Sequence, residues 1–256
     1  MPELPEVETI TRQLNQVLVG QKILSLRGVS LKVKDKRILG VERKAKMIII
    51  KLSGGENLLI HLKMTGQLVL NGEKGKHTRQ VIQFSKDRLI FNDLRKFGWI
   101  RLITNKELRE KLAKLPPDVV DKEFTVGYLK KMLKSSTRAV KLVILDQAKL
   151  GGVGNIYANE ALFRAGIDPR RPADSLAIVE VNRLYKEVRR VIKMGIKYGG
   201  TTASDDKFVN LKGEPGGFQK RLMVYENRAK CLKCKLKIEK VKLGGRGTYY
   251  CPKCQK

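Results

Sequence analysis

Apolar residues recur at helical spacing in the first segment of the chain, residues 3–18. The apolar positions 4, 7, 10, 14, 17 and 18 describe one buried helix face, and Gly20 ends the pattern. Beyond it the chain changes to short β-branched runs separated by Gly, Asn and Asp. These runs predict strands at residues 23–33, 47–52, 57–62, 67–70, 79–84, 88–92 and 99–104. Such regular punctuation is typical of a β-sandwich or barrel.

Helical periodicity returns after Pro116-Pro117, where the β-rich region ends. The spacing predicts helices over residues 126–133, 139–145, 156–165 and 175–198. The predicted fold class is therefore α+β, with an N-terminal helix and sandwich followed by a helical region.

Charge narrows the class of partner. The 256 residues contain 54 Lys+Arg against 25 Asp+Glu, a formal net charge of +29, which points to a polyanion such as nucleic acid. The longest apolar run is residues 47–50, so no membrane-spanning segment or membrane partner is expected. The first eight residues carry three Glu and do not resemble a signal peptide. We expect a cytoplasmic protein, associated with the nucleoid of a prokaryote.

The four cysteines lie near the C-terminus as two Cys-x-x-Cys pairs, sixteen residues apart: Cys231, Cys234, Cys251 and Cys254. This spacing predicts one structural Zn²⁺ held by two knuckles, with strands at residues 235–243 and 246–250 turned at Gly244-Gly245. Two disulfides are the alternative, which a reducing compartment disfavours. Because four Cys ligands close the coordination sphere, the chemistry must lie elsewhere.

The N-terminus offers that chemistry. Removal of Met1 would expose Pro2 as a secondary amine, which can attack an electrophilic carbon and form an iminium ion. Glu3 follows it and could move protons. The alternative is structural, because Pro and acidic residues also favour the first turn of a helix. A second candidate feature, the glycine cluster at residues 151–154, could present N–H groups to a phosphate or form an ordinary turn between helices.

Five separated stretches together resemble bacterial formamidopyrimidine-DNA glycosylase, the 8-oxoguanine repair enzyme. They are PELPEVE at 2–8, KAK at 44–46, HLKMTG at 61–66, GNIYA at 154–158 and YYCPKCQK at 249–256. The resemblance runs from one terminus to the other. It implies an N-terminal β-sandwich domain with a catalytic helix (residues 1–120), a helix-two-turn-helix DNA-binding domain (121–220) and a zinc ribbon (221–256). It also implies a monomer that binds double-stranded DNA containing an oxidised purine or an abasic site.

The resemblance further implies residue roles. Pro2 would be the nucleophile at C1′ of the damaged nucleotide, Glu3 the proton carrier and Lys46 a lesion-phosphate contact that assists catalysis. Met64, Arg95 and Phe97 would fill the gap left by the extruded base. His61, Lys141, Asn155 and Arg246 would contact DNA, and Arg246 would also belong to the catalytic set. Core packing is the alternative for Met64 and Phe97.

Three functions stay open at this point. The first is a bifunctional DNA glycosylase and AP lyase for oxidised purines, which would break the abasic site by β,δ-elimination. The second is an endonuclease VIII type with the same fold that acts on oxidised pyrimidines. The third is a noncatalytic zinc-ribbon DNA-binding protein. A glycine-rich loop at residues 207–218 resembles the one that covers an extruded purine and favours the first function.

Overall fold

The computed structural model describes residues 2–26, 33–203, 208–226 and 228–256. The chain forms two compact units. Unit 1 comprises Met1–Leu115 and Ile196–Gln219, and unit 2 comprises Pro116–Gly195 and Lys220–Lys256. Residues 196–219, which follow the helical region in sequence, thus belong to the same unit as the N-terminal segment.

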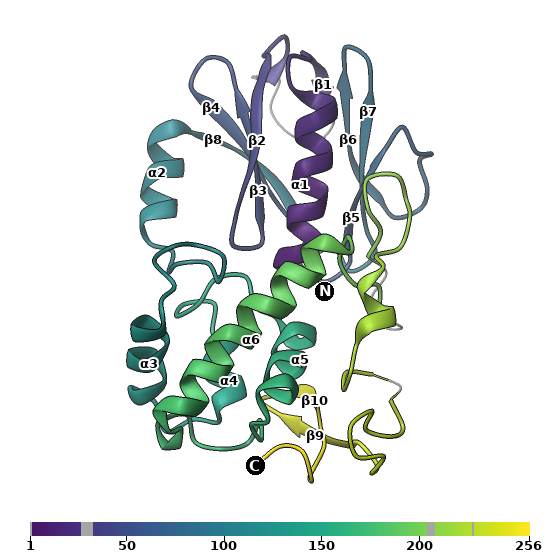
Figure 1. Ribbon diagram of the computed structural model, residues 1–256. Helices are drawn as coiled ribbons and strands as arrows, with labels where there is room; N and C mark the ends of the chain where they lie inside the picture. Colours follow the sequence, from purple (N-terminus) through teal and green to yellow (C-terminus); the bar gives the residue numbers. More distant parts are fainter. Residues whose placement is uncertain (1, 27–32, 204–207, 227) are drawn as a thin grey trace. The chain divides into compact units, whose positions relative to one another are not determined.

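Unit 1 is a β-sandwich of two four-stranded antiparallel sheets (Figure 1). The first sheet has the order β2-β3-β4-β8 and the second β1-β6-β7-β5. The strands are β1 (Ile23–Leu26), β2 (Ile38–Lys44), β3 (Met47–Leu52), β4 (Glu56–His61), β5 (Gly66–Leu70), β6 (Thr78–Phe84), β7 (Arg88–Asp93) and β8 (Trp99–Thr104). The chain changes sheets between β1 and β2, between β4 and β5, and again between β7 and β8.

Helix α1 (Leu4–Leu18) completes the core of the sandwich. Its buried residues Val7, Ile10 and Leu14 pack in one cluster with inward-facing residues of both sheets, such as Ile50 and Phe91. Burial of a single large aliphatic side chain of this kind contributes about 1.5–3 kcal/mol. The apolar face of α1 therefore fixes the position of the N-terminal residues on the sheets.

The helix α2 (Asn105–Ala113) and the strand β2 were not predicted from the sequence. Helix α2 is mostly polar, and a capping box of Thr104 and Glu107 begins it. Its Leu108 packs on the outer face of β3, which explains why residues 47–50 are apolar on both faces of that strand. Strand β2 has a register shift between Ile38 and Gly40, which breaks the period-two pattern.

Two predicted strands are shorter in the structure. The one predicted at 23–33 ends as β1 at Leu26, residues 27–32 lie outside the described part, and Val33 begins a turn. The predicted 235–243 strand begins only at Glu239, because Lys235 (φ 65°) closes the first cysteine knuckle.

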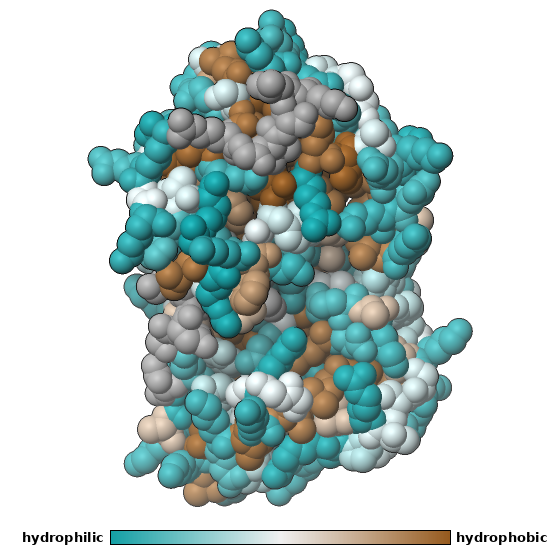
Figure 2. Space-filling model, turned by 180° about the vertical axis from the view of Figure 1, so that it is seen from behind, coloured by the Kyte–Doolittle hydropathy of each residue, from teal (hydrophilic) through white to brown (hydrophobic). Residues whose placement is uncertain are grey.

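The predicted helices are present as α3 (Val126–Lys134), α4 (Val140–Ile144), α5 (Asn155–Ala165) and α6 (Ile178–Lys197). They lie in unit 2, except for the last two residues of α6, which belong to unit 1. Helix α6 starts three residues later than predicted, because Ala173–Ser175 form a separate 3-10 turn, η2. A second 3-10 turn, η3 (Phe218–Arg221), precedes the ribbon. No helix in the described ranges is long and apolar enough to cross a membrane. Hydrophilic residues occupy most of the face drawn in Figure 2, with smaller apolar patches between them.

The ribbon contains a hairpin of β9 (Glu239–Leu243) and β10 (Arg246–Tyr250), which lies between the two cysteine pairs. Gly244 (φ 55°) and Gly245 (φ 77°) form its two-residue turn, as predicted. A two-residue hairpin turn with positive φ at both positions favours glycine, because its twist matches that of the strands. The turn leaves Arg246 exposed at the start of β10.

Candidate functional site

The N-terminal residues of unit 1 form a buried acidic cap on α1. Glu3 and Glu6 make a capping box in which Glu6 Oε2 accepts the Glu3 N–H at 2.8 Å. Glu6 Oε1 accepts the Thr201 N–H at 2.7 Å, so the return segment of unit 1 also binds it. Pro2 is buried, and Glu3 and Glu6 are 2% and 1% exposed. The helix start thus buries Glu3 directly after Pro2 in the chain, and the Glu3 side chain accepts the backbone N–H of Glu6.

Gly200 allows the backbone before Thr201 to pack directly against Glu6. A Cβ at Gly200 would lie 2.9 Å from Cγ of Glu6 and 3.0 Å from the Phe208 ring. The backbone conformation there (φ 85°) also favours glycine. The segment that includes Thr201 can therefore approach Glu6 closely enough to donate its N–H.

Lys46 lies in the turn between β2 and β3, and hydrogen bonds connect that turn to α1. Arg43 Nε donates to Glu8 Oε2 at 2.7 Å, and Arg43 Nη1 donates to the Ala45 carbonyl at 2.8 Å. Burial raises the pKa of Glu8, but hydrogen bonds from Arg43 and Arg12 outweigh this and leave the pKa below its usual value. Glu8 is therefore charged at neutral pH. The Glu8–Arg43 pair connects the helix that carries Pro2 with the turn that carries Lys46, whose side chain is 6% exposed.

His61 lies at the end of β4, opposite Met47 in the sheet register. Its Nδ1 accepts the Lys63 N–H at 3.0 Å, and its ring packs on Trp99 with centroids 5.8 Å apart. Burial, followed by the charges of Lys63 and Lys46, lowers the pKa of His61 to about 4. The imidazole is neutral at pH 7, and its proton lies on Nε2, where it can be donated to a phosphate oxygen.

We expect Lys46→Ala to raise the pKa of His61, because the variant removes one of the two charges that oppose protonation. NMR titration of ¹⁵N-labelled imidazole measures it. Since only the unfolded chain takes up a proton between the ordinary pKa of 6.5 and about 4, the site also loses stability as pH falls through that window. A wild-type pKa near 6.5, unaffected by the variant, would contradict the burial and charge described for His61.

The three residues predicted to fill the gap in DNA lie on exposed tips of unit 1. Met64 and Phe97 are 38% and 55% exposed, so neither packs in the core. The Arg95 guanidinium lies over the Phe97 ring, 5.4 Å from its centroid. Exposed apolar side chains beside a cation have the chemistry that base displacement needs, although their contact with DNA stays a prediction.

In unit 2 the predicted phosphate contacts converge on the β10 backbone. Lys141 is fully buried, and its Nζ donates to the Gly247 carbonyl at 3.0 Å and to Thr248 Oγ1 at 2.7 Å. Asn155 Nδ2 donates to the same carbonyl at 3.1 Å. In this structure both side chains therefore support the residue next to Arg246, which alone of the three is exposed.

The glycine cluster serves packing as well as the start of α5. A Cβ at Gly151 would lie 2.2 Å from Asp118 Oδ1, so this position requires glycine. Gly154 is the N-cap of α5 and offers no capping side chain. The predicted phosphate site at this helix start stays a prediction.

A buried carboxylate holds the segment that leads into the ribbon. Glu160 of α5 is 0% exposed and accepts N–H groups from Met223, Val224 and Tyr225, each at 2.9 Å. Burial raises the pKa of Glu160, and these N–H groups partly offset the rise. One residue earlier, Asn159 Oδ1 accepts the Tyr249 N–H at 2.9 Å. Helix α5 thus fixes both the entry to the ribbon and its second strand.

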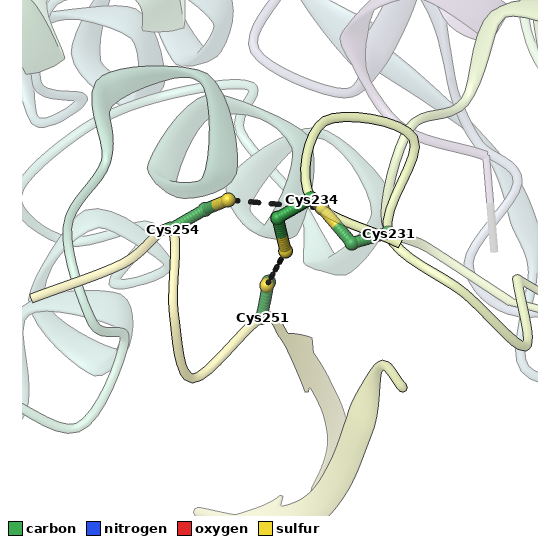
Figure 3. A group of neighbouring side chains, drawn as sticks. All are labelled: Cys231, Cys234, Cys251 and Cys254. Atoms are coloured by element: carbon green, nitrogen blue, oxygen red, sulfur yellow. Dashed lines mark hydrogen bonds between the residues drawn. The ribbon is translucent and has the colours of Figure 1, made fainter. Parts of the chain in front are cut away.

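The four cysteine side chains point toward one another (Figure 3). Their sulfurs lie within 4.8 Å of one another, with Cys234–Cys251 at 3.4 Å and Cys231–Cys254 at 3.8 Å. Four sulfurs at about 2.3 Å from a tetrahedral Zn²⁺ would be roughly 3.8 Å apart, so the cluster fits this ion. These separations are longer than the roughly 2.05 Å of an S–S bond, so the arrangement favours a metal cluster over two disulfides.

The predicted lesion loop at 207–218 is largely packed in unit 1; Lys207 lies outside the described part. Phe208 and Leu211 join the sandwich core, and Leu211 N–H donates to Gln13 Oε1. A Cβ at Gly216 would lie 2.3 Å from the Gly200 carbonyl oxygen, so this glycine permits close backbone packing. Only residues 212–215 are exposed as a tip.

Comparison with known proteins covers the whole chain. Three family models match: the formamidopyrimidine-DNA glycosylase N-terminal domain at residues 1–100, the formamidopyrimidine-DNA glycosylase H2TH domain at 115–207, and a zinc finger found in FPG and IleRS at 229–256. The formamidopyrimidine-DNA glycosylase of Carboxydothermus hydrogenoformans is 37% identical and that of Thermus thermophilus 40%, over 100% of this chain and 100% and 98% of theirs.

Solved structures agree. The crystal structure of the Fpg protein from Thermus thermophilus superposes with a TM-score of 0.92 at 39% identity, covering 99% of this chain and 98% of that one. The Lactococcus lactis Fpg in complex with DNA containing N7-benzyl-Fapy-dG superposes with a TM-score of 0.91 at 31% identity, over 100% of both chains. A complex of the same protein with DNA containing an abasic site gives the same values. These matches confirm the predicted fold of helix, sandwich, helix-two-turn-helix module and zinc finger.

Proposed function

This chain belongs to the formamidopyrimidine-DNA glycosylase family, and we propose that it excises oxidised purines from duplex DNA and cleaves the resulting abasic site through Pro2. The observation that carries the proposal is the buried cap at the start of α1. It buries Pro2 and Glu3 next to each other in the chain, and Thr201 fixes the Glu6 side of the Glu3–Glu6 capping box. A cap that only began a helix would not need a carboxylate network that is almost wholly buried.

The chemistry follows from these groups. The Pro2 nitrogen bonds to C1′ while the bond to the base breaks; the base leaves with the electron pair and takes the proton that the nitrogen loses. A proton supplied by Glu3 to the sugar ring oxygen lets the ring open to the iminium ion. The iminium acidifies C2′, and loss of that proton expels the 3′ phosphate. A second elimination expels the 5′ phosphate.

Access to C1′ requires the damaged nucleotide to leave the stack, at a cost of a few kcal/mol. The exposed Met64 and Phe97 offset this cost by replacing the lost stacking, and Arg95 offers hydrogen bonds to the base left opposite. Lys46, His61 and Arg246 supply donors for phosphates, and the net charge of +29 draws the protein to DNA.

The substrate class is tested by competition. With 8-oxoguanine opposite cytosine and thymine glycol opposite adenine in one reaction, we expect the oxidised purine to be removed faster. Two facts support this preference: the packed glycine-rich segment ends in an exposed tip at residues 212–215, and a relative's structure contains a Fapy-dG derivative in DNA. Faster removal of the oxidised pyrimidine would favour the endonuclease VIII type. A chain that binds DNA but removes neither base would be the noncatalytic DNA-binding protein.

A further inference from the structure

One buried carboxylate lies where the sandwich of unit 1 changes sheets. Asp93, the last residue of β7, is 1% exposed. Its Oδ1 accepts the Thr65 hydroxyl and the Arg95 N–H, the latter at 3.2 Å, and its Oδ2 accepts the Gly98 N–H at 2.7 Å. A buried carboxylate needs several donors to offset its lost hydration, and here they come from two different loops.

The two loops are two of the connections between the sheets. The first crossover, residues 62–65, leads from β4 to β5, and the second crossover, residues 94–98, leads from β7 to β8. His61 pairs with Trp99 where they meet one sheet, and Gly66 pairs with Asp93 where they meet the other. The crossovers therefore run next to each other, and the Thr65–Asp93 hydrogen bond links them.

Each crossover carries part of the proposed wedge. Met64 lies on the first, directly before Thr65, and Arg95 and Phe97 lie on the second. Each tip also contains a lysine in the left-handed backbone region, Lys63 (φ 53°) and Lys96 (φ 61°). This conformation is unfavourable for residues other than glycine and persists where the surrounding contacts enforce it.

Glycines at the ends of the two crossovers, Gly66 and Gly98, let the backbone pack closely against neighbouring atoms. A Cβ at Gly66 would lie 2.4 Å from the Leu62 carbonyl oxygen. A Cβ at Gly98 would lie 2.7 Å from the Phe91 ring and 3.1 Å from Asp93 Oδ2. The backbone around Asp93 is thus fitted to the carboxylate, and a displaced crossover would lose these hydrogen bonds.

We propose that Asp93 is a positioning residue that holds Met64, Arg95 and Phe97 as one preformed wedge. The inference rests on the proposed function, in which these residues replace an extruded base. Asp93 itself is too buried to touch DNA and acts only through the crossovers. A wedge fixed before DNA binds loses less conformational freedom when it enters the stack. Neutralising Asp93 should therefore slow base extrusion and leave the reaction at Pro2 unchanged.

The test compares two substrates. We expect Asp93→Asn to slow excision of 8-oxoguanine from a paired duplex by about tenfold to a hundredfold, the effect of one lost hydrogen bond to a buried charge. Cleavage of a preformed abasic site, where no base has to leave the stack, should change by less than about threefold. The matched control is Asp87→Asn before the other end of β7, where the carboxylate accepts from Gln21 and Asn71 away from both crossovers. It should change neither rate.

A second variant tests the proposal if Asp93→Asn does not fold. Thr65→Val keeps the side-chain shape and the Asp93–Gly98 hydrogen bond but removes the Thr65–Asp93 hydrogen bond between the crossovers. Thr65→Ser should restore that hydrogen bond. Adding Asp93→Asn to a Met64→Ala/Phe97→Ala protein should also cost less than adding it to wild type. The inference would be overturned if Asp93→Asn slowed both reactions equally at an unchanged Tm. It would also be overturned if the effect of Asp93→Asn on excision were as large in the Met64→Ala/Phe97→Ala protein as in wild type. A wild-type protein inactive on both duplexes would instead reject the proposed function.

Discussion

A protein that retains one extra residue ahead of Pro2 is expected to lose glycosylase and abasic-site lyase activity by at least about 10³-fold. The extension turns the Pro2 amine into a tertiary amide, which has no electron pair free to attack C1′. Initial rates on 8-oxoguanine and abasic duplexes measure the effect, and N-terminal mass analysis confirms the extension.

Binding provides the control for this result. Because the extension leaves the wedge and the cations in place, affinity for a duplex with a tetrahydrofuran site should change by less than about threefold. Glu3→Gln should likewise bind DNA while base excision falls by about 10²-fold or more. Turnover by the extended protein at the wild-type rate would show that Pro2 is not the nucleophile.

Loss of the zinc site is expected to have the second large effect. The ribbon core is small: Phe163, Val224, Cys231, Ile238 and Cys251 are its buried members. Metal binding and folding of such a segment are therefore one event. Chelation or Cys234→Ser should unfold the hairpin, displace Arg246 and weaken binding to any duplex by about tenfold or more, with recovery of the chelated protein on adding Zn²⁺.

Salt dependence gives this prediction a second readout. Neutralisation of about five or six phosphates predicts a log–log slope of roughly −4 to −6 for wild type, and loss of the ribbon should make it shallower. The matched control is Leu232→Ser, which places a hydroxyl in the same knuckle at a side chain that is 45% exposed and binds no metal. A chelated protein that binds and cleaves normally would rule out the role of the ribbon.

The periodicity of apolar residues predicts elements that bury one face, such as helix α1 and most of the strands. It does not predict helix α2, because α2 buries only Leu108, which packs on the outer face of β3. The four consecutive residues at 47–50 are apolar on both faces of β3 because α2 covers the outer face, but the sequence alone does not reveal which element covers that face.

The site divides in the same way. The residue types of Pro2 and Glu3 predict an amine nucleophile with a proton carrier, and the cysteine spacing predicts a zinc site. Lys46, Met64 and Phe97 could be identified only through the family resemblance. Asp93, the Glu8–Arg43 pair and Asn159 were missed. Each has a partner that is distant in sequence, at 28, 35 and 90 residues, and no local signal marks a contact that only the fold creates. From the sequence, Asp93 at the end of a strand is indistinguishable from an ordinary turn residue, because its hydrogen-bond donors are known only from the structure.

The nucleophile is tested most directly by reductive trapping. Wild-type protein would be incubated with an 8-oxoguanine duplex and borohydride, and the cross-linked peptide identified by mass spectrometry. We expect a stable protein–DNA adduct on the Pro2 nitrogen, because reduction of the iminium makes the bond between that nitrogen and C1′ permanent. Base excision without any adduct, or an adduct confined to a lysine such as Lys46, would contradict it.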